Sequence, residues 1–83
     1  MAVVRLPAIL AREAGGRNAF ETAAPTLRAA LSELPVADLV FDPRGELRPL
    51  VNVFVDGEDA RTKLDAPLGA GAEVRVVAAV AGG

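Results

Sequence analysis

The feature that most constrains the fold is a single apolar stripe at helical spacing, made by Leu27, Ala30, Leu31 and Leu34. Thr26 is a suitable N-cap for this helix, because its hydroxyl can accept a hydrogen bond from the first turn, and Pro35 ends it. One such stripe can cover only one face of a sheet. The other face is therefore expected to be solvated or covered by a partner.

Five segments on either side of this helix are predicted to be strands: Val3–Ile9, the weaker Asn18–Thr22, Leu50–Val55, the short return strand Glu58–Arg61, and Glu73–Val80. The Gly15-Gly16 pair predicts a turn between the first two strands, which then form a hairpin with a long connection. Between the helix and the third strand, Ala37–Phe41 is expected to form a short helical turn that carries Leu39.

The strongest strand signal is Leu50–Val55, followed by a favoured hairpin turn at Asp56-Gly57. Alternation places two sets on opposite faces, with Val51, Val53 and Val55 on one and Leu50, Asn52 and Phe54 on the other. In the last strand the same rule predicts Val74 and Val76 inward, with Arg75 and Val77 outward. The sequence thus predicts one α+β domain over 1–83, with one main helix across one face of a mixed sheet.

Composition excludes several functional classes. The net charge is −2 and neither Trp nor Tyr is present, which argues against a nucleic-acid module. The absence of Cys and His excludes zinc sites built on those residues and catalysis by a thiol or imidazole. No apolar run approaches the length of a membrane span, and no leader is visible, so a cytoplasmic protein is expected. Asp56, Glu58 and Asp59 lack the full spacing of a calcium loop, so no metal is expected.

After the last strand the sequence continues as Ala81-Gly82-Gly83. Glycine tolerates nearly any backbone geometry and has no side chain, so such a segment can thread into a narrow cleft of another protein. A flexible tail is therefore expected at 80–83. A frayed terminus with no function is the alternative.

The strand order and the diglycine resemble the ubiquitin-like β-grasp sulfur carriers, a family that includes the small subunit of molybdopterin synthase and the thiamine-pathway carrier. The resemblance extends through most of the chain and rests on Leu6-Pro7, Thr26-Leu27, Leu50–Val53, Glu58-Asp59 and Ala79–Gly83. Within the family, the chain is most similar to the actinobacterial carriers that supply sulfur for cysteine synthesis. It departs from the family at the helix start, where Ala29 cannot complete a capping box with Thr26.

This resemblance implies a route for the chemistry at Gly83. A carboxylate is a poor acyl donor because it is ionised at neutral pH. A partner enzyme would use ATP to adenylate Gly83, and a sulfur nucleophile would displace AMP to give a thiocarboxylate. The chain itself would be no enzyme and would bind no cofactor; it would donate sulfide to an acceptor enzyme making cysteine, molybdopterin or a thio-metabolite. Gly82 would give the tail its slimness, and Ala81 would extend it.

The expected partner-binding residues are Ala81, Phe54, Leu50, Val77 and Arg75, with Phe54, Leu50 and Val77 forming an apolar docking patch. The alternative for Phe54 is that a loop covers it. Arg48, Arg61 and Arg75 either steer an acidic partner or belong to a solvated face. The protein is expected to be a monomer that docks on the activating enzyme and the acceptor enzyme. Two other functions stay open, a protein modifier joined to lysines through Gly83 and an interaction module with an inert tail.

Overall fold

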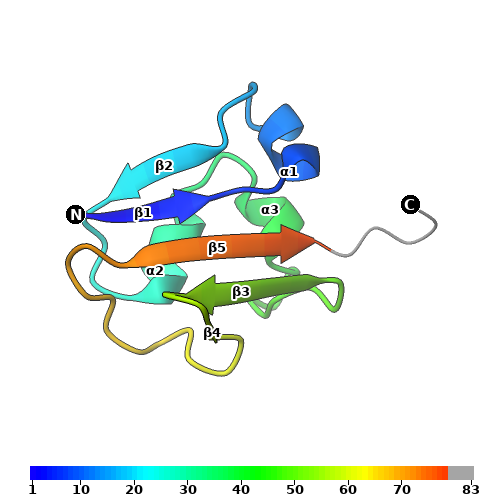
Figure 1. The fold of residues 1–83 in the computed structure, drawn as a ribbon. Coiled ribbons are helices and arrows are strands. Elements are labelled where there is room, and N and C mark those ends of the chain that lie inside the picture. Colours follow the sequence, from blue (N-terminus) through cyan, green and yellow to red (C-terminus); the bar gives the residue numbers. More distant parts are fainter. Residues whose placement is uncertain (79–83) are drawn as a thin grey trace.

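In the computed structural model, which describes residues 1–78, five strands form one mixed sheet in the order β2-β1-β5-β3-β4 (Figure 1). The central strands β1 and β5 are parallel, and the other neighbours are antiparallel. The strands are β1 (Ala2–Arg5), β2 (Ala19–Thr22), β3 (Val51–Val55), β4 (Glu58–Asp59) and β5 (Glu73–Ala78). The predicted α+β class and mixed sheet are confirmed.

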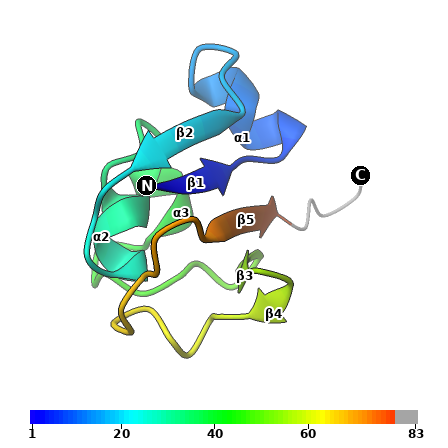
Figure 2. The ribbon, with the colours of Figure 1, turned by 60° about the vertical axis from the view of Figure 1, so that its left-hand side comes forward.

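Three short helices accompany the sheet: α1 (Ala8–Glu13), α2 (Leu27–Ser32) and α3 (Ala37–Val40). Figures 1 and 2 show α2 and α3 on one face of the sheet, whereas α1 lies beyond the end of β1. The predicted apolar stripe is buried, since none of its four residues is more than 5% exposed. The Thr26 hydroxyl accepts a hydrogen bond from the Ala29 amide at 3.1 Å, as an N-cap does.

The core lies between this helical layer and the inward face of the sheet. The central inward side chains are the fully buried Val4, Val53, Val74 and Val76, and they belong to the same cluster as the stripe of α2. Val55 is half-buried and packs against that cluster. Arg75 and Val77 are exposed on the other face of β5, so the predicted orientation of both strands is confirmed.

The predicted strand over Val3–Ile9 is confirmed as far as Arg5 and is wrong beyond it. β1 ends at Arg5, and α1 begins after Pro7, whose carbonyl accepts hydrogen bonds from the amides of Leu10 and Ala11 at 3.0 and 2.9 Å. Gly15 has a φ of 76°, and the Gly16 amide donates to the Ala11 carbonyl at 2.8 Å. This arrangement closes the C-terminus of a helix, so the glycine pair caps α1 within the β1–β2 connection. The antiparallel pairing of β1 with β2 is as predicted.

Three further boundaries differ. Leu50 precedes β3, which begins at Val51, because the Val51 amide closes a turn onto the Arg48 carbonyl at 3.0 Å. The predicted return strand Glu58–Arg61 is shorter in the structure, where β4 ends at Asp59. The next residue, Ala60, is buried in the core. β5 is described as far as Ala78, and the predicted positions 79 and 80 lie outside the described residues. The turn before β4 is as predicted, with φ values of 51° at Asp56 and 87° at Gly57.

Within the described part of the chain, the helices are all too short or too polar to cross a bilayer.

Candidate docking face and carrier tail

The predicted tail at 80–83, with Ala81, Gly82 and Gly83, lies outside the described residues. Ala78, the last described residue, ends β5 opposite Val51 of β3. Five residues follow it in the sequence, so at full extension Gly83 reaches no farther than about 17 Å from Ala78. Any partner acting on Gly83 must therefore place its reactive site within about 17 Å of Ala78.

Two exposed apolar side chains lie at this end, on the sheet face opposite the helices. Val77 is 40% exposed and Leu50 is 55% exposed. Together with Asn52, Pro49 and Arg61 they line a shallow hollow of about 270 Å³. The structure thus brings together two predicted patch residues that are distant in the sequence. Exposed leucine and valine beside one another are typical of a surface that another protein covers.

The other two predicted residues, Phe54 and Arg75, are paired across β3 and β5 on the same face. Arg75 lies two residues before Val77 in β5, and outward positions recur every second residue. The Phe54–Arg75 pair is therefore the next outward pair away from the end of β5. Phe54 is half-buried and Arg75 is exposed. We call this surface, made of Leu50, Phe54, Arg75 and Val77, the docking face. Its role in binding stays a prediction.

Arg5 was not predicted as part of this surface. It pairs with Arg75 across the central strands, and both line a second hollow of about 180 Å³ that also includes Pro7 and Val77. The Nε of Arg5 donates to Glu73 at 2.7 Å, and the Nη2 of Arg75 lies 3.9 Å from the same carboxylate. Alternation in the first strand places Arg5 outward, but only the parallel β1–β5 pairing shows which side chain it meets. Val77 stands between the two hollows and contributes to both.

Arg48 and Arg61 stabilise the backbone around Leu50 by hydrogen bonds to main-chain carbonyls. Arg61 donates to the carbonyls of Val51 and Arg48, the latter at 3.1 Å, and Arg48 donates to the Asp38 carbonyl at 2.9 Å. These bonds tie down the backbone on both sides of Leu50. Steering of an acidic partner stays a prediction for these two arginines, as it does for the exposed Arg75.

The acidic residues of the β3–β4 hairpin also serve the fold. An Asp56 carboxylate oxygen accepts from the Glu73 amide at 2.9 Å, and Asp59 accepts from the Arg61 amide at 3.0 Å and the Asn52 side chain at 3.1 Å. The Arg61 amide, followed by the Asn52 side chain, lowers the pKa of Asp59. Residues 1–78 contain no group of three or more acidic side chains placed to hold a metal ion.

A mixed five-stranded sheet with helices on one face, whose central strand leads to a diglycine, defines a β-grasp protein of the ubiquitin-like class. The chain belongs to the ThiS family, whose model matches residues 4–83. Its structural neighbours are ubiquitin-like sulfur carriers. Nothing among curated proteins matches the sequence significantly.

Three solved structures illustrate the likeness. CysO of Mycobacterium tuberculosis is 29% identical, with a TM-score of 0.84 over 96% of this chain and 100% of that one. The Amycolatopsis orientalis BexX/CysO complex contains a chain that is 27% identical, with a TM-score of 0.81 over 100% of both chains. SAMP1 of Haloferax volcanii is 31% identical, with a TM-score of 0.76 over 99% of this chain and 98% of that one.

Proposed function

We propose that this protein carries sulfur as a thiocarboxylate on Gly83. The Gly83 carboxylate attacks ATP in the active site of an activating enzyme, giving an acyl-adenylate and releasing pyrophosphate. Hydrosulfide, or an enzyme persulfide with a reductant, then attacks the acyl carbon and displaces AMP. The resulting thiocarboxylate donates its sulfur in an acceptor enzyme, and water supplies the oxygen that replaces the sulfur and restores the Gly83 carboxylate. The chain is the protein substrate of these steps, and ATP is bound by the activating enzyme.

The observation that carries this proposal is the position of the docking face at the end of β5, the strand that precedes the diglycine in the sequence. β5 supplies Arg75 and Val77 to that face and ends five residues before Gly83. A partner that covers Val77 and Leu50 has the tail within its reach. The family model supports the same reading because its match includes the diglycine.

In this proposal the acceptor enzyme makes cysteine, molybdopterin or a thio-metabolite. The BexX/CysO complex supports docking on partner enzymes, because a relative that is 27% identical over its full length forms such a complex. We expect this chain to act as a cytoplasmic monomer that binds the activating enzyme and the sulfur acceptor in turn, through the docking face, Ala81 and Gly82.

A second function is favoured by one comparison. SAMP1 of H. volcanii is described as a small archaeal modifier protein. Modification of proteins would use the same acyl-adenylate, with a lysine amine in place of the sulfur nucleophile. Lys63 is the only lysine of this chain, so conjugation of one copy to another is restricted to Lys63 and the N-terminal amine.

Sulfide transfer tests the proposal. Wild-type protein and a variant lacking Gly83 are incubated with ATP, a sulfide donor and an extract of the host, repurified, and assayed for sulfide released on acid treatment. We expect release from the wild type and none from the deletion, while both unfold at the same urea concentration, because the described core ends before the tail. Equal release from the two proteins would refute a role for Gly83. High-mass conjugates without sulfide would favour the modifier.

A further inference from the structure

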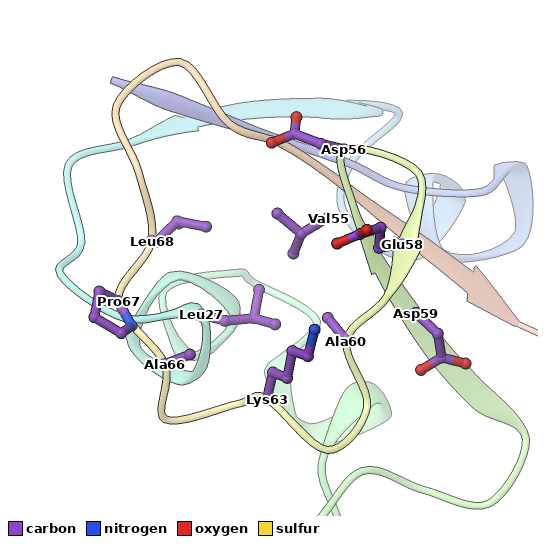
Figure 3. Close-up of a pocket in the computed structure, with 10 residues that line it drawn as sticks. All are labelled: Leu27, Val55, Asp56, Glu58, Asp59, Ala60, Lys63, Ala66, Pro67 and Leu68. Atoms are coloured by element: carbon purple, nitrogen blue, oxygen red, sulfur yellow. The ribbon is translucent and has the colours of Figure 1, made fainter.

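A hollow larger than these two lies away from the docking face (Figure 3). It is formed by the β3–β4 hairpin, by residues 63–68 of the loop after β4, and by Leu27 of α2. Its volume is about 420 Å³. The apolar part of its lining consists of Leu27, Val55, Ala60, Ala66, Pro67 and Leu68. Leu27 and Ala60 are buried in the core, so the floor of this pocket is the outer surface of the core itself. We call it the hairpin pocket.

Two opposite charges stand at the mouth of the hairpin pocket. Figure 3 shows Glu58 reaching over the opening from β4 and Lys63 lying across it from the following loop. Both residues are exposed. Among the ion pairs formed by residues 1–78, none uses the Glu58 carboxylate or the Lys63 ammonium. Asp56 and Asp59, the other acidic residues of the lining, are already engaged with the Glu73 amide and with Asn52 and Arg61.

The pocket lies at the opposite end of β3 and β5 from Ala78, where the described chain ends. Val55, which lines it, pairs with Val74, whereas Ala78 pairs with Val51 at the other end of the same two strands. Four residues of strand separate the two ends, or roughly 14 Å. Val55 also points to the helical side of the sheet, opposite the docking face. A partner seated in the hairpin pocket would therefore leave Leu50, Val77 and the start of the tail accessible.

We propose that the hairpin pocket is a second protein-docking site, which receives an aliphatic side chain of a partner flanked by one basic and one acidic residue. The aliphatic group fills the apolar floor, the basic group pairs with Glu58, and the acidic group pairs with Lys63. The exposed rim suits a peptide segment, which continues on either side of the pocket. This site does not depend on the sulfur chemistry, and it allows one protein to hold the carrier while another acts on Gly83.

The test is an NMR titration of the full-length, isotope-labelled protein with short blocked peptides. The probes are acetyl-Lys-Leu-Glu-amide and acetyl-Glu-Leu-Lys-amide, since the partner segment can run in either direction. The control peptide is acetyl-Lys-Ser-Glu-amide, which keeps both charges without the aliphatic group. We expect saturable shifts of the amides of Val55, Ala60 and Leu68 with at least one leucine peptide, no shift at Val77, and no saturation with the serine peptide.

Charge reversal supplies the second arm. Glu58→Lys and Lys63→Glu should each weaken peptide binding about two- to fivefold, as expected for exposed ion pairs. Glu13→Lys and Arg12→Glu on α1 change the net charge equally and should leave binding unchanged. The proposal is overturned if neither leucine peptide saturates, if the shifts centre on Val77, or if all four variants respond alike. Binding of free leucine as tight as that of the peptide would make this an amino-acid site and would also overturn it.

Discussion

Single residues decide the local geometry of the β3–β4 hairpin. Asp56 and Gly57 both have positive φ, which few side chains tolerate. The hydrogen bond that the Asp56 carboxylate accepts from the Glu73 amide offsets the backbone strain at Asp56. The hairpin in turn shapes the pocket mouth and keeps β3 in register with β5. The sequence predicts this turn correctly because its type depends only on the two central residues, Asp56 and Gly57.

Gly57→Ala is expected to lower the free energy of unfolding by about 1–2 kcal/mol, because a Cβ disfavours the φ of 87° although no atom lies within 4 Å of it. Gly69→Ala is the matched control, since it also has open space but no positive φ. The control should leave stability unchanged or raise it by up to about 1 kcal/mol. Urea unfolding measures both, and equal effects would contradict the argument.

Asp59 gives the hairpin a pH dependence. Its pKa is lowered in the folded state, so its contribution to stability is present above the unfolded value of about 3.9 and is lost as the pH falls through the folded value. We expect the urea midpoint to fall between pH 5 and pH 2, and to fall less in Asp59→Asn, whose amide oxygen still accepts a hydrogen bond without titrating. Parallel curves for the two proteins would show that Asp59 contributes nothing to acid sensitivity.

At the scale of elements, the helical stripe of α2 dominates the core. Leu31 is fully buried, whereas Leu39 on α3 is 37% exposed. We expect Leu31→Ala to cost about 2–5 kcal/mol of unfolding free energy through lost burial and a residual cavity. Leu39→Ala, the same change at an exposed site, should cost less than about 1 kcal/mol. Urea unfolding of both proteins is the measurement, and similar losses would mean that α2 does not centre the core.

The elements that the sequence predicted are those with long or unambiguous patterns. The stripe of α2 and the alternation of β3 and β5 extend over enough residues to fix both type and orientation. α1 was missed because its six residues continue the apolar run of β1, so no change of period separates the two. Pro7 and the Gly15-Gly16 pair were the available signals, since proline favours helix starts and glycine favours helix ends.

The site residues that could be predicted are likewise those with a local sequence pattern. Leu50, Phe54, Arg75 and Val77 were placed on one face by alternation alone, and the structure has all four there. Arg5 needed the parallel pairing of β1 with β5, which connects residues seventy positions apart and has no local signal. The structural part of Arg61 likewise depends on how the loop after β4 folds back toward Val51. The hairpin pocket needed tertiary contacts between three separate segments.

At the scale of the whole molecule, the docking face and Gly83 have different roles, so a substitution on the docking face tests partner binding without changing the reacting residue. Val77→Asp should slow activation of the tail about tenfold or more, because it removes a central apolar contact of the interface and adds a carboxylate that must lose its water on docking. Leu39→Asp on α3 is the control, since Leu39 is 37% exposed and α3 lies on the helical side of the sheet, opposite the docking face. The rate of adenylate-dependent sulfur incorporation measures both. Equal rates would place the docking surface elsewhere.

The most direct test of the account is the intact mass of the protein after incubation with ATP, a sulfide donor and the purified activating enzyme. The account predicts a gain equal to the replacement of one oxygen by one sulfur, located at Gly83 by fragmentation and absent when Gly83 is deleted. An unchanged mass, with pyrophosphate release showing that the enzyme had activated the tail, would contradict the assignment as a sulfur carrier.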